Sequence, residues 1–228
     1  MSRPQLTLDL FKPAPHDFAS FVRGANGEAT AAVESWARGE GPTVLFLRGA
    51  HGTGKSHLLQ AAISALPARG MYVPLRELFA AGEALLDDLD SVGAVALDDI
   101  DLCAGHAGWE RRLFNLYNAL LVGGRRLLWS ARAEPAFALP DLASRLRASL
   151  TYQLQELTDA NKAAVLRARA AARGLELPEA VVEFVMARER RDLATLVLLL
   201  DELDAAALAA GRALTVPLAR EVLAARQT

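Results

Sequence analysis

Short apolar runs alternate with amphipathic stretches along the chain as far as Leu157. The runs with the length of buried strands lie at Val44–Leu47, Met71–Val73, Ala94–Leu97, Leu127–Trp129 and Thr151–Leu154. The stretches with helical spacing lie at Glu28–Arg38, from Lys55 to about Leu66, near Glu77–Leu86 and at Trp109–Val122. Because strands that alternate with helices build parallel sheets, this pattern predicts an α/β fold whose mostly parallel sheet is covered on both faces.

The pattern changes after Leu157, where the strand-like runs end and segments rich in Ala, Leu and Arg follow. Thr158 is suited to cap the first helix of this region, Gly174 to end it and Pro178 to begin the next. Further helices are expected at Asp192–Ala210 and Pro217–Arg226. We therefore expect an N-terminal tail at 1–12, an α/β core at 13–157 and a small all-helical domain at 158–228.

Composition narrows the class of protein. The 228 residues are 52% hydrophobic with a formal net charge of −2, so bulk electrostatics do not favour nucleic acid, and contact with DNA is expected to be indirect. The single cysteine, Cys103, cannot form an internal disulfide. No apolar run approaches the roughly 20 residues that span a bilayer, and the first residues do not resemble a signal peptide. We expect a cytoplasmic protein with no membrane partner.

Gly49–Ser56 matches the phosphate-binding pattern G-x-x-x-x-G-K-[ST] in full, between a predicted strand and a predicted helix. Glycines let such a loop wrap phosphates with inward N–H groups, and the helix adds its positive end. Lys55 would contact the β- and γ-phosphates, and the Ser56 hydroxyl would hold Mg²⁺. The expected ligand is ADP or ATP with Mg²⁺. The candidate nucleotide-binding residues here are Gly49, Gly52, Thr53, Gly54, Lys55, Ser56 and His57.

Two carboxylates follow the predicted strand at Ala94–Leu97. Parallel strands carry their carboxyl ends to one edge of a sheet, so Asp98 and Asp99 are expected beside the phosphate loop. Asp98 would act on Mg²⁺ through water, and Asp99 would orient or polarise an attacking water. Without the loop upstream, the same residues would be an ordinary acidic turn.

Arginines commonly stabilise charge on a transferring phosphoryl group, in cis or from a neighbouring protein. Arg145, between the last two predicted strands, could project toward another protein, and Arg191 could fold back over this chain's own nucleotide. The spacing alone is equally consistent with both residues being ordinary surface arginines.

Taken together, these segments resemble the AAA+ ATPase branch that contains the bacterial replication initiator DnaA, and within it the Hda-type regulatory inactivators of DnaA. The resemblance runs almost the whole chain. It rests on Phe18–Phe21 with Gly24 and Asn26, Gly54–Ala61, Leu97–Ile100, Trp109–Glu110, Leu113–Asn118, Leu139–Leu142, Ser144–Leu146, Arg191–Leu193 and Leu200–Asp204.

The resemblance implies a five-stranded AAA+ core followed by a helical lid. By position, Arg145 corresponds to the arginine finger and Arg191 to the lid arginine called sensor 2. Phe21 and Val22 fall where such proteins hold the adenine base. The chain departs from the pattern at Ala131, which stands where a polar sensor 1 residue is usual, so we expect weak intrinsic ATP hydrolysis.

The N-terminal tail resembles the short peptides that bind the replication sliding clamp. In an extended peptide, Gln5 would satisfy polar groups at the rim of a clamp pocket, while apolar side chains would enter it. The candidate clamp-binding residues are Gln5, Leu6, Leu8, Leu10 and Phe11. Taken alone, the same residues would also suit an edge strand.

These features lead to one principal hypothesis about replication initiation. The chain would bind adenine nucleotide, dock on a DNA-loaded clamp (the polymerase β subunit) and present Arg145 to ATP-bound DnaA, whose ATP is then hydrolysed. The chain ends soon after the lid, which argues against an initiator carrying its own DNA-binding domain. The alternatives are a stand-alone ATPase such as a helicase loader, acting as a homo-oligomer, and a clamp adaptor with a vestigial nucleotide site. A homodimer is possible.

Overall fold

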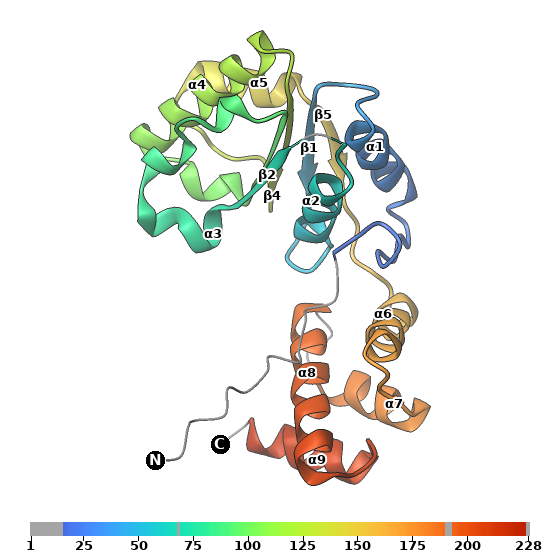
Figure 1. Cartoon of the computed structure of the whole chain (residues 1–228). Helices are drawn as coiled ribbons and strands as arrows, with labels where there is room; N and C mark the ends of the chain where they lie inside the picture. The colour runs from blue at the N-terminus through green and yellow to red at the C-terminus, as the bar shows by residue number, and fades with distance from the viewer. Residues whose placement is uncertain (1–15, 68, 190–192, 227–228) are drawn as a thin grey trace, which may run out of the picture.

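A single parallel sheet organises the first half of the molecule (Figure 1). The computed structural model describes residues 16–67, 69–189 and 193–226. Its strands are β1 (Val44–Arg48), β2 (Gly70–Pro74), β3 (Ala94–Asp98), β4 (Arg126–Ala131) and β5 (Leu150–Gln153). Their order across the sheet is β2-β3-β4-β1-β5, and every pairing is parallel. The predicted five-stranded parallel sheet is therefore confirmed.

Helices cover both faces of this sheet, because successive strand residues point to opposite sides. Val44 and Phe46 of β1 pack with the layer that contains α4 (Ala107–Val122) and α5 (Pro140–Ala148). Leu45 and Leu47 pack with the opposite layer, which contains α1 (Gly27–Ala37) and α2 (Lys55–Ser64). A strand buried on both sides must be apolar at every position, which explains the continuous runs in the sequence.

The segment after β2 differs from the prediction of one short helix near Glu77–Leu86. It contains α3 (Leu75–Leu78) and the 3-10 helices η1 (Phe79–Ala81), η2 (Glu83–Leu86) and η3 (Leu89–Ser91). Gly82 lies between η1 and η2 with φ of +89° and ψ of 163°, values outside the helical region, so one continuous helix cannot form there. A further 3-10 helix, η4 (Ile100–Cys103), follows β3.

The helical lid packs around a core of its own. In the described residues it comprises α6 (Asp159–Ala172), α7 (Glu179–Arg188), α8 (Leu193–Ala210) and α9 (Val216–Ala225). The Thr158 hydroxyl accepts a hydrogen bond from the Asn161 N–H at 3.3 Å, as expected of a cap. Apolar side chains such as Leu166, Leu199 and Leu203 are buried between these helices. Among the described residues, no helix has the length and apolar character needed to cross a bilayer.

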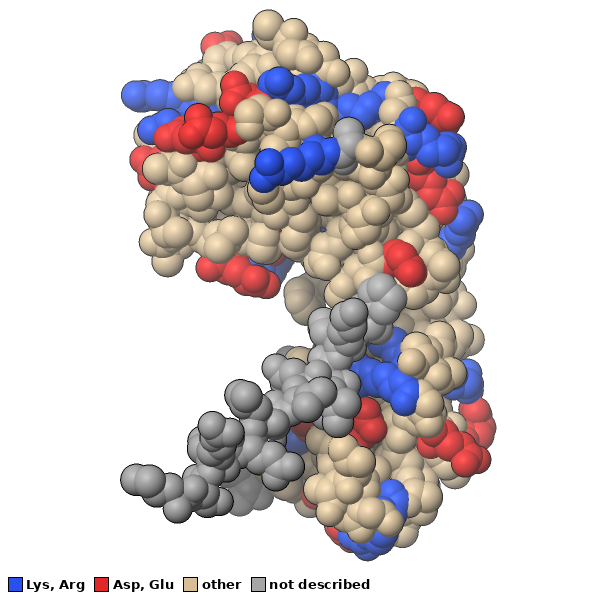
Figure 2. All heavy atoms as spheres, viewed as in Figure 1, with Lys and Arg blue, Asp and Glu red and all other residues tan. Residues whose placement is uncertain are grey.

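The surface between the two parts is hollowed (Figure 2). Basic and acidic residues are interspersed on the face shown, without a large patch of one sign. This mixture agrees with the small net charge of −2.

Candidate nucleotide site

The loop Gly49–Ser56 joins β1 to α2, so strand and helix flank it as predicted. Gly54 has a φ of +96°, which L side chains rarely adopt, and a Cβ there would lie 2.6 Å from a ring carbon of Phe21. A Cβ on Gly49 would lie 2.9 Å from the Leu154 carbonyl oxygen. Glycine is therefore required at both positions, because neighbouring atoms lie too close for a Cβ. The loop also packs directly against Phe21 of the N-terminal segment.

Lys55 is held beneath this loop by the loop's own backbone. Its ammonium donates hydrogen bonds to the carbonyl oxygens of Gly49 and Ala50 at 2.7 and 2.9 Å. Burial lowers the pKa of Lys55 below its usual value, although Asp99 and Asp98 oppose that shift. A buried cation satisfied only by neutral carbonyls is well placed to exchange them for an anion.

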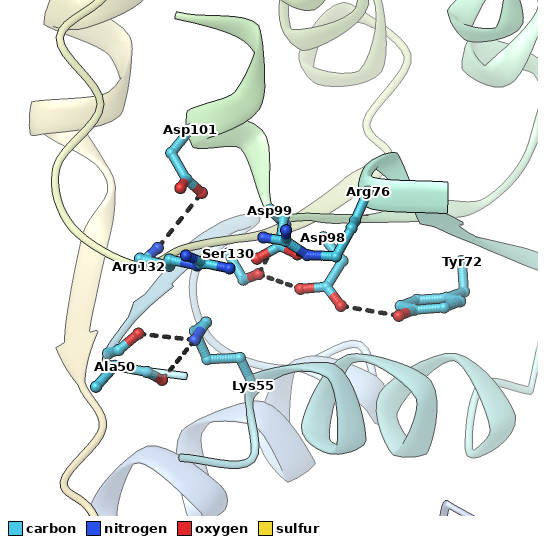
Figure 3. Close-up of polar contacts among 10 residues, drawn as sticks. Ala50, Lys55, Tyr72, Arg76, Asp98, Asp99, Asp101, Ser130 and Arg132 are labelled. Carbon is cyan, nitrogen blue, oxygen red and sulfur yellow. Dashed lines mark hydrogen bonds and ion pairs between the residues drawn. The ribbon is translucent and has the colours of Figure 1, made fainter. Parts of the chain in front are cut away.

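Asp98 ends β3 with both carboxylate oxygens engaged (Figure 3). One oxygen accepts a hydrogen bond from the Ser130 hydroxyl, and the other accepts one from the Tyr72 hydroxyl at 2.8 Å. Burial and the Asp98 charge raise the pKa of the Tyr72 phenol, so Tyr72 remains a donor. Strand β4 lies between β1 and β3, so Ser130 of β4, rather than the phosphate loop, is the immediate neighbour of Asp98.

Asp99 is turned away from the strand direction by a left-handed backbone with φ of +59°. Its carboxylate forms an ion pair with Arg76, with 2.8 Å between Oδ2 and Nε, and its N–H donates to the Ser130 hydroxyl at 3.2 Å. The predicted water-orienting carboxylate is thus paired with a cation. Ala131, at the position aligned with sensor 1, ends β4 fully buried.

A cavity of about 640 Å³ lies between the core and the lid. We call it the interdomain cavity. Of the predicted nucleotide-binding residues, it brings together Phe21, Val22, Gly52, Thr53, Gly54, Lys55, Ser56 and His57, with both acids Asp98 and Asp99. Gly49, the first residue of the loop, is not among the lining residues. The lid contributes an apolar wall that includes Val165, Val197 and Leu198.

His57 fastens the N-terminal segment to α2. Its Nε2 donates to the Asp17 carbonyl oxygen at 2.8 Å, and its ring packs edge-on against Phe21 with 5.2 Å between centroids. Burial lowers the pKa of His57, which favours the neutral ring. This histidine therefore shapes the wall that carries Phe21.

Arg145, the predicted arginine finger, is not in this cavity. Arg145 lies on α5, is exposed, and has its guanidinium carbon 5.8 Å from the centre of the Tyr117 ring. It is not among the residues that line the interdomain cavity. Arg191, and the tail residues Gln5, Leu6, Leu8, Leu10 and Phe11, lie outside the described residues.

Sequence reasoning missed several cavity residues. Tyr72 lies in the middle of β2, which pairs with the acidic strand β3, and periodicity gave no sign of its role. Arg76 lies at the start of α3, and its position just after a strand could have suggested it. Arg132 follows β4, and its N–H lies 3.4 Å from a carboxylate oxygen of Asp101. Arg169, on α6, carries no distinguishing signal because exposed helix positions commonly hold arginine.

Glu110 connects the acidic edge of the sheet to the helix that carries Arg145. Its carboxylate is buried and accepts hydrogen bonds from the N–H groups of Gly105, Ala138 and Leu139 at 2.8, 3.0 and 2.6 Å. Leu139 immediately precedes α5, and Gly105 follows η4. Burial alone would raise the pKa of Glu110, but the three donors outweigh it and hold the pKa below its usual value.

We expect Glu110→Gln to destabilise the protein by about 2–3 kcal/mol at pH 7, since an amide cannot satisfy all three buried donors. A carboxyl group whose pKa is lower in the folded state than in the unfolded state stabilises the fold at pH values above the unfolded-state pKa. That contribution is lost as the pH falls through the folded-state pKa. The difference in unfolding free energy should therefore shrink below about pH 4.3. Urea denaturation of the wild type and of Glu110→Gln at pH 7 and at pH 3.5 measures this difference. A difference that is constant with pH would contradict this role.

Two sequence comparisons cover most of the chain. The bacterial DnaA ATPase domain matches residues 13–156, and the Hda lid domain matches residues 159–223.

Solved structures share the fold at low identity. Domain III of the Thermotoga maritima replication initiation protein DnaA is 24% identical, with a TM-score of 0.81 over 92% of this chain and 96% of that one. AMPPCP-bound DnaA from Aquifex aeolicus is 21% identical, with a TM-score of 0.64 over 81% of this chain and 64% of that chain. The Thermotoga maritima RuvB Holliday junction branch migration motor is 16% identical, with a TM-score of 0.63 over 87% and 67%. Because the DnaA ATPase domain matches more than half of the sequence and the Hda lid most of the remainder, the chain belongs to the DnaA-related AAA+ family, as a protein of the Hda type.

Proposed function

We propose that this replication regulator binds an adenine nucleotide in the interdomain cavity, docks on the DNA-loaded sliding clamp and stimulates hydrolysis of ATP bound to DnaA. One observation carries the proposal: residues 51–56 of the phosphate loop line the cavity, whereas the exposed Arg145 lies outside it on α5. A guanidinium that cannot serve its own nucleotide is available to the nucleotide of a partner.

The residues of the cavity fit an adenine nucleotide with Mg²⁺. Lys55 supplies the cation for the phosphates, and the ring of Phe21 with Val22 and Val165 supplies apolar walls for a base. Ser56 and Asp98 offer hydroxyl and carboxylate oxygens, the donors that Mg²⁺ prefers. Bound Mg²⁺ would neutralise phosphate charge. The DnaA from Aquifex aeolicus, with which the chain shares its fold, is described as AMPPCP-bound.

Three features support slow hydrolysis in the chain's own site. Ala131 has no polar group, Asp99 is paired with Arg76, and both oxygens of Asp98 accept protein hydrogen bonds. A nucleotide that is held without rapid turnover would stabilise one arrangement of core and lid. We propose ADP as the resident nucleotide, acting as a structural ligand rather than as a substrate.

Clamp docking is tested by replacing Gln5, Leu8 and Leu10 with Ala in a DnaA-ATP hydrolysis assay that contains DNA-loaded clamp. We expect stimulation to fall about 10²-fold at low protein concentration, because the clamp raises the effective concentration of the regulator near DnaA. A matched variant with Thr7→Ala and Asp9→Ala changes the intervening polar positions and should stimulate normally. Equal stimulation by both variants would refute clamp docking through the tail.

The alternative, a homo-oligomeric ATPase, predicts a different result without DnaA. In that case ATP turnover by the chain alone would rise with protein concentration, because Arg145 of one copy would serve the next. Concentration-independent, slow turnover supports the regulator instead.

A further inference from the structure

Arg169 is a cation of the lid that lines the interdomain cavity. It lies four residues after Val165 on α6, so both side chains share the helix face toward the core. Arg169 is half-buried, and it forms no hydrogen bond or ion pair with any residue in the described part of the chain. A desolvated guanidinium without a partner is costly, so a cavity that holds one favours an anion.

The acidic residue with the strongest influence on Arg169 is already engaged. Asp201 of α8 lies 2.6 Å from Arg173, one turn further along α6, and that arginine also lies 3.8 Å from Asp204. Burial lowers the pKa of Arg169, and Asp201 offsets only part of this effect. Asp201 and Asp204 pair with Arg173, so Arg169 receives only partial compensation through space from Asp201 and makes no ion pair with a described acid.

The groups facing Arg169 from the core are also not acids that pair with it. Its positive charge helps to lower the pKa of both His16 and His57, after burial in each case, so these rings lie within its field. His57 follows Ser56 on the first turn of α2, where the helix presents its positive end. Arg169 and the phosphate loop thus line the same cavity from opposite domains, and the field of Arg169 reaches His57 next to the loop.

We propose that Arg169 binds a phosphate group of the nucleotide held by the loop and thereby fastens the lid to the core. This inference rests on the proposed nucleotide binding. It assigns a phosphate contact to α6, separate from the lid arginine Arg191. Val165 would meet the uncharged part of the ligand, while Arg169 would meet its charge.

The test is calorimetric titration of the full chain, freed of nucleotide, with ADP. We expect Arg169→Ala and Arg169→Gln to weaken ADP binding by about 10- to 100-fold, the range for one lost charge-assisted hydrogen bond. Arg169→Lys should recover most of the affinity, because an ammonium still binds phosphate as a point charge. The matched control is Arg167→Ala on the same helix, whose guanidinium pairs with Glu179 of α7, and it should bind ADP like the wild type.

Each result decides a different question. If the wild type takes up no ADP, the proposed nucleotide binding fails. If the wild type binds and Arg169→Ala binds within about twofold of it, only the Arg169 inference is overturned. If Arg169→Gln retains as much affinity as Arg169→Lys, the side chain contacts an uncharged group, and the phosphate assignment is wrong. Urea denaturation without ADP should show the Arg169 variants at least as stable as the wild type, which separates loss of binding from loss of fold.

Discussion

Replacing Arg145 with Ala should lower the stimulation of DnaA-ATP hydrolysis by about 10³-fold, the lower end of the range for arginine fingers. The guanidinium is exposed on α5 and lies against the Tyr117 ring, with no ion pair to another described residue. Because this arginine has no ion pair to break, moving it beside the phosphates of a partner costs little free energy. There it would stabilise the negative charge that develops in the transition state. Single-turnover hydrolysis of ATP prebound to DnaA measures the effect.

Two further variants separate this role from a general effect of charge. Arg147→Ala removes an exposed arginine from the same helix and should leave stimulation within about twofold of wild type, as expected for one surface charge. Arg145→Lys should fail nearly as completely as Arg145→Ala, because an ammonium lacks the planar fork that contacts two phosphate oxygens. Full stimulation by Arg145→Ala would exclude the arginine-finger mechanism.

Replacing Lys55 with Ala should weaken ADP binding by about 10²-fold, the equivalent of about 3 kcal/mol in charge-assisted hydrogen bonds to phosphate. In the present structure the ammonium uses its donors on the Gly49 and Ala50 carbonyl oxygens, so those donors are aimed at the loop that would hold the phosphates. Fluorescence titration with a labelled ADP measures the affinity.

The matched control for Lys55→Ala is Arg38→Ala, at the end of α1. It removes one exposed cation, whose partner is Glu40, and both residues precede β1 whereas the loop follows that strand. It should bind ADP like the wild type. If Lys55→Ala also binds normally, the loop does not hold the phosphates, and the proposed nucleotide site is wrong.

Local pattern predicted the parts of the fold that depend on neighbouring residues. The apolar runs became β1 to β5, and Thr158 caps α6 through the hydrogen bond that its side chain accepts from Asn161. The Gly49–Ser56 loop lies between strand and helix for the same reason, since its glycines and its flanking segments are adjacent in sequence. The region after β2 was predicted less well, because Gly82 divides a helical pattern into short turns.

Contacts between residues that are far apart in the sequence could not be predicted from local pattern. The motif residues Asp98 and Asp99 are adjacent in sequence, yet Asp98 binds Tyr72 and Ser130 while Asp99 binds Arg76. These partners come from three different segments, and only the strand order brings them together. The position of a strand in a sheet depends on packing over the whole domain, which periodicity does not report.

The sequence by itself determined the five strands, most of the longer helices, the phosphate loop and the family, because these depend on short-range spacing and on the identity of residues within motifs. Only the tertiary structure decided that Arg145 lies outside the interdomain cavity and that the acids are engaged by Tyr72, Ser130 and Arg76. It also decided that Arg169 lines the same cavity as the loop without a hydrogen bond or ion pair to a described residue. Charge and hydrogen bonding act through space over a few ångströms, so the partners of these side chains follow from how strands and helices pack.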